Sequence, residues 1–487
     1  MDRTSFIQSI RLRNLLSYGP DAPALELRPL NVLIGPNASG KSNLIVALSL
    51  LAAAPGNLQA PIRQGGGISE WLWKGEESTS DARLDVAFGF PAESDSLLYR
   101  LSFSETGGRF SLLDESVESL GAGSENPTPL YGYRNGNPVI STRTVGSEGA
   151  EDSERTERTL RPEDVRPDQS ILSQRRDPDI YPELTGLSRR LESIRFFRNG
   201  ILGSVAPFRE AKWADLPIDP LLEGGRDLGV RRLKLGEGLG IGGAVGAVGP
   251  VMWNLGRNLQ HFLKTKRRFL GHMQRFCKRV FLGEDIRKPA APVREAQRTD
   301  LPIDFLLEDG GNLGLVLNDL QHRPEIKRHI LARMQRFYER ISDISTKIHA
   351  GTVQIFFHET GLARPVPSAR LSDGSLRYLC LLTILCHPEP PPLICMEEPE
   401  LGLHPDVIPS VADLLVEASA RTQLVVTTHS DILVDALTDV PESIVVCEKT
   451  EGGTTLRRLE SERLDAWLER YRLGELWQMG EIGGNPE

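Results

Sequence analysis

Asn31-Val-Leu-Ile-Gly-Pro-Asn-Ala-Ser-Gly-Lys-Ser-Asn-Leu44 is the stretch around which the rest of the chain can be interpreted. Its residues 35–42 have the spacing G-x-x-x-x-G-K-S of a phosphate-binding loop. The apolar run 32–34 before the loop is typical of a strand, and residues 44–54, which lack Gly and Pro, are typical of a helix. The strand, loop and helix together predict a binding site for a nucleoside triphosphate, because a chance match would lack this context.

The chemistry of the loop assigns a role to each residue type. Glycines allow the backbone to turn so that N–H groups and a helix N-terminus face anionic oxygens. Lys41 is expected to reach the β- and γ-phosphates, and the Ser42 hydroxyl is expected to hold Mg²⁺. The residues predicted to contact the nucleotide here are Gly35, Asn37, Ser39, Gly40, Lys41, Ser42 and Asn43.

The composition describes an ordinary globular protein of 487 residues, with 39% hydrophobic and 25% charged residues. The net charge of −9 argues against a protein coated in nucleic acid, although it leaves room for a local basic patch. The five cysteines form no C-x-x-C pair, which favours buried thiols in a reducing compartment. No apolar run approaches 18 residues, so we expect a cytoplasmic protein that does not interact with membranes.

The N-terminal region, residues 1–115, reads as one part of a nucleotide-binding head. Residues 5–16 and 25–27 are expected to form strands, and the alternation over 83–113 predicts antiparallel hairpins. Gln64 precedes three glycines and could sense Mg²⁺ and the γ-phosphate, or could simply lie in a surface turn. Residues 116–183 are rich in Gly, Ser, Glu, Arg and Pro, and we expect a flexible polar segment there.

The middle of the chain, residues 184–350, is expected to form an inserted, largely helical lobe with an internal repeat over 208–281 and 293–341. The first copy carries a glycine-rich insertion, 236–249, whose G-x-G-x-x-G match lacks a preceding strand and is interpreted as a linker. Both copies end in basic helices, near 257–281 and 323–341. These helices could be solvated faces, contacts to nucleic-acid phosphates, or contacts to a protein partner.

The second half of the site lies in residues 351–450. The strand expected over 393–398 ends in Glu397 and Glu398, and the strand expected over 424–428 is followed by His429. The ends of parallel strands meet at one edge of an α/β sheet. Glu397 would supply an oxygen ligand to Mg²⁺, and Glu398 would position or deprotonate water. His429 would contact the γ-phosphate.

These motifs resemble the RecF/SMC-type branch of the ABC-type ATPases, in particular stand-alone AAA-family proteins close to RecF. The resemblance is carried by the loop 35–42, Leu-Ser-Asp-Gly-Ser at 371–375, Glu-Pro-Glu-Leu-Gly-Leu-His-Pro at 398–405, His429 and the closing run 473–484. It covers roughly residues 1–115 and 295–487. It implies an α/β fold: an ABC-type head with a mixed sheet and P-loop, an antiparallel β subdomain and an inserted lobe.

The same resemblance implies ATP and Mg²⁺ as cofactors, ATP hydrolysis, and a homodimer or higher homo-oligomer with two ATPs between two heads. Ser372 and Gly374 of one head would complete the phosphate site of the other. The chain departs from the family pattern at Glu397, where an Asp is usual, and in its duplicated repeat. Residues 451–487 are expected to pack on the head or on a partner.

Two functions remain open at this stage. The protein could engage DNA in repair or genome maintenance, or it could be an ATP-operated switch that holds and releases an effector protein, as in anti-phage defence. The basic helix at 257–281, which has no acidic residue, favours the first. A membrane transporter subunit is disfavoured by the length of the chain between Ser42 and Leu371, and a fused nuclease by the short segment after His429.

Overall fold

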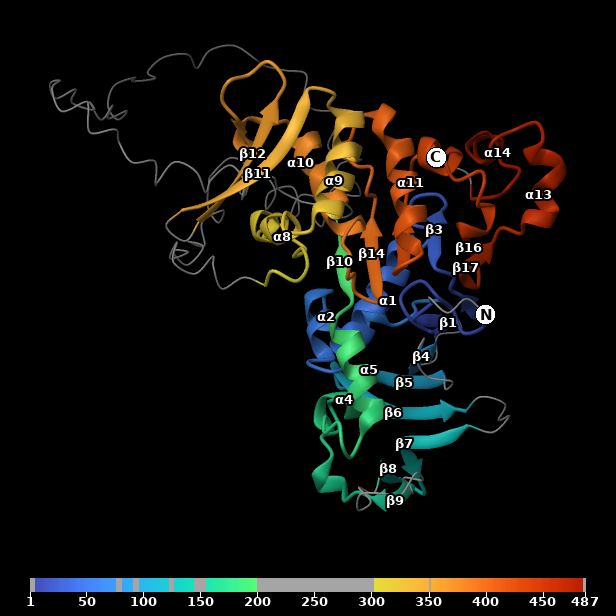
Figure 1. Cartoon of the computed structure of the whole chain (residues 1–487). Helices are drawn as coiled ribbons and strands as arrows, with labels where there is room; N and C mark the ends of the chain where they lie inside the picture. The colour runs from blue at the N-terminus through green and yellow to red at the C-terminus, as the bar shows by residue number, and fades with distance from the viewer. Residues whose placement is uncertain are drawn as a thin grey trace, which may run out of the picture. The chain divides into compact units, whose positions relative to one another are not determined.

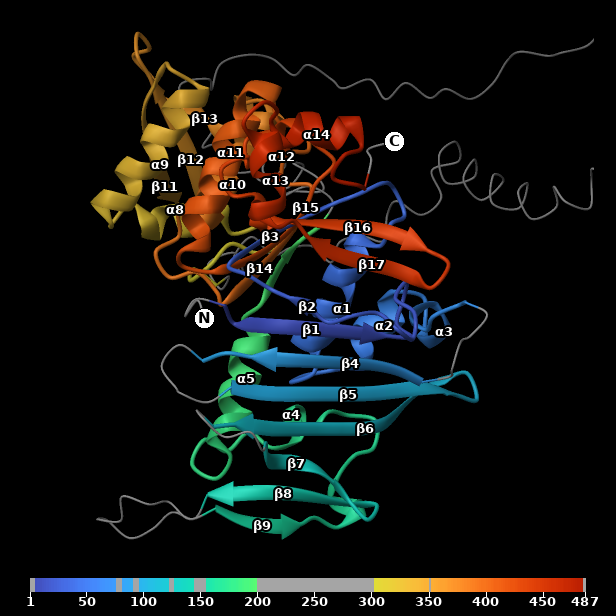
Figure 2. The same cartoon turned by 90° about the vertical axis from the view of Figure 1, so that its right-hand side faces the viewer.

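The computed structural model describes residues 5–75, 81–90, 96–121, 127–143, 155–198, 302–349 and 352–484. Three sheets run through these residues (Figures 1 and 2). The first copy of the repeat, its glycine-rich insertion and the basic helix predicted at 257–281 lie outside the described residues. In the parts of the chain given above, every helix is too short or too polar to cross a lipid bilayer.

A six-stranded sheet carries the phosphate-binding loop. Its order is β10 (Arg195–Phe197), β14 (Leu393–Glu397), β15 (Gln423–Thr427), β3 (Leu30–Ile34), β16 (Ile444–Thr450) and β17 (Gly453–Arg458). Neighbouring strands are parallel except β16 and β17. Every residue of the central strands β3 and β15 is buried, and most of these residues are apolar, because both faces of the sheet are covered.

Alternate residues of each central strand enter two different cores. Val32 and Ile34 pack on the side of α10 (Asp373–Leu385) and α11 (Ile408–Ser419), whereas Leu33 faces α1 (Lys41–Ala53) and α5 (Pro182–Glu192). The predicted strand, loop and helix are therefore present. The mixed sheet, the antiparallel subdomain and the helices confirm the expected α/β class and the ABC-type head.

An eight-stranded antiparallel sheet lies on the α1 side (Figure 2). Its order is β2 (Leu25–Glu26), β1 (Ile7–Arg13), β4 (Asp81–Phe88), β5 (Ser96–Thr106), β6 (Arg109–Leu120), β7 (Thr128–Arg134), β8 (Asn137–Arg143) and β9 (Arg155–Thr159). The hairpins expected over 83–113 are present, and so is the first strand. An irregular register between Ile7 and Ser9 accounts for the imperfect alternation of that strand.

The prediction of a flexible polar segment over 116–183 is wrong for its described residues. They form most of the outer strands of the antiparallel sheet, followed by α4 (Ile171–Gln174) and the start of α5. The strands pair by backbone hydrogen bonds and bury few side chains, and every residue of β9 is exposed. The sequence of β9 is polar on both faces, and the buried residues Leu130 and Tyr131 of β7 are consecutive, so neither strand shows apolar alternation.

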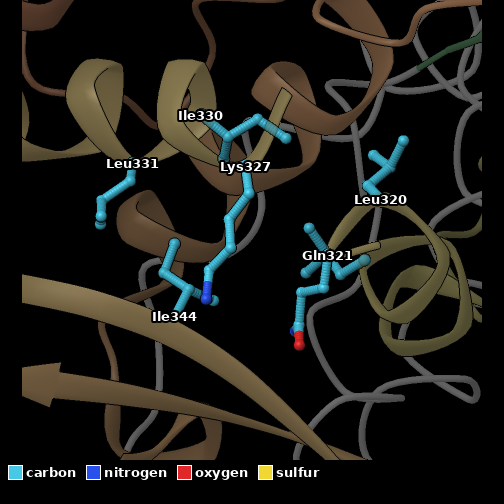
Figure 3. Close-up of a pocket in the computed structure, with 7 residues that line it drawn as sticks. Leu320, Gln321, Lys327, Ile330, Leu331 and Ile344 are labelled. Atoms are coloured by element: carbon cyan, nitrogen blue, oxygen red, sulfur yellow. The ribbon is translucent and has the colours of Figure 1, made fainter. Parts of the chain in front are cut away.

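The described part of the inserted lobe is not only helical. Helices α8 (Leu313–Leu320) and α9 (Pro324–Phe337) accompany a three-stranded sheet of β11 (Ile341–His349), β12 (Thr352–Glu359) and β13 (Val366–Pro367). Apolar side chains of α8, α9 and β11 enclose a pocket of about 20 Å³ (Figure 3). It is lined mainly by Leu317, Leu320, Ile330, Leu331 and Ile344.

Gln423 joins the two large sheets. Its side chain is fully buried, accepts a hydrogen bond from the Ile7 N–H at 2.8 Å and donates to the Ile7 carbonyl, also at 2.8 Å. A third hydrogen bond reaches the Arg28 carbonyl at 3.2 Å. The side-chain amide of Gln423, at the start of β15, therefore satisfies both the N–H and the carbonyl of Ile7 in the other sheet.

We expect Gln423→Ala to lower the free energy of unfolding by about 2–3 kcal/mol, because buried backbone groups of Ile7 lose their partners. Urea unfolding followed by circular dichroism measures this loss. The matched control is Gln59→Ala, whose amide makes only exposed hydrogen bonds. Equal stability of the two variants would contradict the bridging role of Gln423.

Candidate nucleotide site

Three adjacent parallel strands bring the predicted site residues to one edge of the sheet. β15 lies between β3, which leads to Lys41, and β14, which ends in Glu397 and is followed by Glu398. His429 follows β15, and its Nε2 lies 3.8 Å from Oε1 of Glu398. Lys41 is close enough for its charge to affect the pKa of His429. The lysine, carboxylate and histidine predicted from separate motifs therefore lie close together.

The phosphate loop has the tight backbone that its glycines predict. Gly35, Ala38 and Gly40 have φ of 149°, 61° and 103°. A Cβ at Gly35 would lie 2.2 Å from the Cys447 carbonyl oxygen, and one at Gly40 would lie 2.3 Å from Oγ1 of Thr454. Both positions therefore exclude any side chain.

Lys41 is buried and points back into its own loop. Its Nζ donates hydrogen bonds to the carbonyls of Gly35 at 2.7 Å and Pro36 at 2.9 Å. Burial lowers the pKa of Lys41, and the nearby Cys447 and Glu398 oppose that shift. An anionic ligand in the loop would therefore interact with a poorly hydrated ammonium group, which strengthens the attraction.

The loop contains polar groups that suit a phosphate. Ser39 Oγ is buried and has no hydrogen-bond partner among the described residues. Ser42 is exposed in the first turn of α1, and Asn37 is exposed at the tip of the loop. The amide of Asn43 donates to Ser17 Oγ at 2.8 Å, so this predicted ligand is bound to the protein itself.

The donors also fit Mg²⁺. The hydroxyl of Ser42 and the carboxylate of Glu397, half-buried at the end of β14, are hard oxygen ligands. In the described ranges no group of three or more His, Cys, Asp or Glu side chains gathers as a metal site.

Three residues that the sequence did not single out hold the loop in place. The Tyr18 hydroxyl donates to the Gly40 carbonyl at 3.2 Å, and Thr454 Oγ1 donates to the Ser39 carbonyl at 2.8 Å. Thr454 is also 2.7 Å from Ser17 Oγ. Tyr18 and Thr454 are more than 400 positions apart in the chain, so no local pattern could have linked them.

Glu398 occupies a left-handed backbone conformation with φ of 47°, which is unusual for a residue with a side chain. Its N–H donates to the Thr427 carbonyl at 2.9 Å, which extends the pairing of β14 with β15 by one residue. Strained backbone of this kind is concentrated at functional sites. Burial and the positive charge of Lys41 lower the pKa of His429, and the nearby Glu398 opposes this shift, so the neutral imidazole is favoured overall.

Glu400, which belongs to the motif at 398–405, is a further residue of the site, although the sequence predicted no role for it. Its Oε1 accepts hydrogen bonds from the Thr428 hydroxyl and, at 3.3 Å, from the His429 N–H. Burial raises the pKa of this carboxyl group, and Oε2 is buried without a partner among the described residues. Glu400 therefore ties the segment after β14 to the backbone of His429.

Glu400→Ala should lower kcat for ATP hydrolysis by about tenfold, or about 1.4 kcal/mol, because His429 loses the acceptor that positions its backbone. The KM for ATP should change less than kcat, since Glu400 does not touch the phosphate loop in the described contacts. The control is Leu401→Ala, an exposed neighbour. A normal kcat in Glu400→Ala would exclude a positioning role.

Ser372 and Gly374 lie at the exposed start of α10. The Ser372 hydroxyl caps this helix by accepting from the Ser375 N–H at 3.2 Å. A Cβ at Gly374 would lie 3.2 Å from the Gly402 carbonyl oxygen. The capped N-terminus of a 13-residue helix favours an anion in front of it. Gln64, the last residue of α2 (Gln59–Gln64), is exposed, and no contact in the described structure assigns it to the site.

The sequence matches the family model described as "AAA domain, putative AbiEii toxin, Type IV TA system" over residues 30–123 and 255–435. No curated protein matches the chain. Similar solved structures include an "SmcHead bound to the C-winged helix domain of ScpA", with 13% identity, a TM-score of 0.47 and coverage of 94% of this chain and 99% of that one.

Two more structures are similar at this low level. The Smc head domain from Pyrococcus furiosus, bound to the C-terminal domain of ScpA, has 15% identity and a TM-score of 0.45, with coverage of 95% and 98%. The SMC head domain from Thermotoga maritima has 13% identity and a TM-score of 0.36, with coverage of 93% and 99%.

Proposed function

This chain belongs to the AAA-domain family matched above, and from that premise we propose that it binds ATP with Mg²⁺ and hydrolyses it in a dimer of heads. The observation that supports this most is the meeting of Lys41, Glu398 and His429 at the ends of three adjacent strands. Family membership and site geometry both support this chemistry.

Each residue has a defined task in this proposal. Lys41 and the N–H groups of the loop bind the phosphates, while Ser42 and Glu397 hold Mg²⁺, which would neutralise phosphate charge. Glu398 orients the attacking water and accepts its proton. His429, whose backbone is positioned by Glu400, donates or accepts a hydrogen bond at the γ-phosphate.

The second head would complete each site through the start of α10. An arginine in place of Ser372 would fill the exposed helix N-terminus with a bulky side chain and remove its cap. We expect Ser372→Arg to bind ATP with normal affinity as a monomer and to lose ATP-dependent dimerisation. Sedimentation velocity with ATP measures this, and Arg377→Ala on the same helix serves as the control. A dimer of normal stability would refute the composite site.

We further propose that the ATP-operated head engages DNA. Among the basic residues of α9, Lys327 (labelled in Figure 3) forms an ion pair with Asp343 at 2.8 Å, and Arg333 forms one with Glu417 at 2.7 Å. The charges of these two residues are therefore balanced within the protein. Arg328 and Arg336 are exposed on the same helix. These two arginines are the available phosphate contacts of α9.

The test is the ATPase rate with and without duplex or single-stranded DNA at low and moderate salt. Stimulation that fades as salt rises supports phosphate contacts. A double variant, Arg328→Ala with Arg336→Ala, should lose part of the stimulation, whereas Lys327→Ala should retain it. A rate that is indifferent to DNA at every salt concentration would exclude DNA engagement.

The alternative is an ATP-operated switch that holds an effector protein. It is favoured by the ion pairs that occupy Lys327 and Arg333, by the net charge of −9, and by the toxin named in the family description. Both functions share the ATPase site and differ in whether DNA changes its rate. A DNA-independent ATPase that releases a co-purifying protein when ATP is added would support the switch.

A further inference from the structure

One segment of the C-terminal region contacts both sides of the nucleotide site. It consists of α14 (Leu473–Met479) and residues 480–484, and is called the C-terminal strap here. Helix α14 packs against α12 (Asp431–Asp435), as Figure 2 shows, and the residues after α14 run to the phosphate loop. The sequence analysis expected this region to pack on the head or on a partner, without assigning it a role.

The first half of the strap holds the helix that follows His429. The Leu473 N–H donates to Thr438 Oγ1 at 3.1 Å, and the Gln478 amide donates to the Asp431 carboxylate. A Cβ at Gly474 would lie 2.6 Å from the Asp431 carbonyl oxygen, so the two helices are in close contact. Since α12 begins directly after His429 and Ser430, the strap supports the histidine side of the site.

The second half of the strap reaches the first glycine of the loop. The Gly484 N–H donates to Glu448 Oε1 at 3.1 Å, and the buried Trp477 indole N–H donates to the Gly484 carbonyl. Arg457 donates to the Ile482 carbonyl at 2.8 Å. These hydrogen bonds fix the end of the strap on β16 and β17.

Gly484 leaves no free space beside Gly35. With φ of 60°, a Cβ at Gly484 would lie 3.2 Å from the Gly35 Cα and 2.8 Å from Val446 Cγ1. On its other side Gly35 is close to the Cys447 carbonyl oxygen. Gly35 is therefore enclosed by β16 and by the strap, and its own carbonyl accepts a hydrogen bond from Lys41.

We propose that the C-terminal strap is a positioning element of the nucleotide site, which holds Gly35, and with it the phosphate loop, against the same sheet edge as His429. This inference rests on the proposed ATP binding. A displaced strap loosens the loop, so ATP affinity falls more than kcat does. Gly484 and Trp477 act through the loop and do not touch the nucleotide.

The direct test is Gly484→Ala. We expect about tenfold weaker ATP binding by calorimetry, because Gly35 must shift to admit the methyl group, while kcat at saturating ATP changes by less than about twofold. Without nucleotide, amide hydrogen exchange should increase in the peptide that contains residues 35–42. Met479→Ala is the control, since Met479 is an exposed residue of the strap.

Two further variants separate this role from simple overpacking. Adding Val446→Ala to Gly484→Ala removes the contact with Val446 but leaves the contact with Gly35, so the affinity defect should persist. Trp477→Phe removes the hydrogen bond to Gly484 without adding bulk, and should weaken ATP binding by about threefold. This variant tests the proposal even if Gly484→Ala does not fold. Rescue by Val446→Ala, or normal affinity in Trp477→Phe, would overturn the proposal.

ATP binding by the wild-type protein distinguishes a failure of the strap inference from a failure of the proposed function. If it binds ATP and Gly484→Ala binds equally well with unchanged hydrogen exchange, the strap inference fails and the ATPase proposal stands. If the wild type does not bind ATP, the proposed function fails. An equal loss of affinity in Met479→Ala would also overturn the inference, because the effect would not depend on contact with Gly35.

Discussion

Lys41→Ala is expected to weaken ATP binding by about 100-fold or more, because a buried ammonium that contacts phosphate contributes about 3 kcal/mol. The variant should fold normally, since the hydrogen bonds of Lys41 within the described part of the chain go to two carbonyls of its own loop. Water can replace the ammonium at these carbonyls once the side chain is removed. Isothermal titration calorimetry with ATP and Mg²⁺ measures the affinity, and the ATPase rate should fall to background.

Lys74→Ala provides the control for this experiment. Lys74 is exposed and pairs only with Glu70 on the surface, so its removal should change neither affinity nor stability measurably. Unchanged ATP affinity in Lys41→Ala would refute the assignment of residues 35–42 as the phosphate loop. A parallel loss of stability in Lys41→Ala, seen as a lower unfolding midpoint, would instead indicate a structural role.

Glu398→Gln is expected to bind ATP normally and to hydrolyse it about 10²- to 10⁴-fold more slowly, the usual contribution of a general base. Glutamine preserves the size of the side chain and can occupy the same backbone conformation, but it cannot accept the proton from water. Because the nucleotide remains intact, dimers of heads should accumulate. Single-turnover hydrolysis and sedimentation in ATP measure the two effects.

Glu389→Gln is the matched control, since Glu389 is exposed and pairs with Arg323 outside the site. A normal hydrolysis rate in Glu398→Gln would exclude Glu398 as the residue that positions water. Normal binding with slow hydrolysis but no dimer would retain the catalytic assignment and reject the sandwich of two heads.

The sequence predicted the parts of the site that depend on strand ends. A phosphate loop, a strand ending in two carboxylates and a strand ending in histidine are local patterns, and parallel pairing places their ends together. The order β14-β15-β3 was not needed for this prediction. What the prediction required was only that the strands share one sheet.

The remaining features depend on contacts between distant residues. Thr454 supports the loop from strand β17 and Tyr18 from the connection after β1, and Glu400 reaches Thr428 through one carboxylate. No periodicity encodes such contacts. The outer strands over 116–183 were missed for a different reason, because β9 is polar on both faces and the buried residues of β7 are consecutive rather than alternating.

The position of β3 between β15 and β16 has a consequence for synthesis of the protein. β3 is made early, but both strands that pair with it come after residue 420. At about 5–20 residues per second, an apolar strand with two open edges remains unpaired on the ribosome for roughly 20–80 s. In a nascent chain β3 therefore has no partner strand until roughly the last seventh of the polypeptide emerges, and the nucleotide site is among the last parts to form.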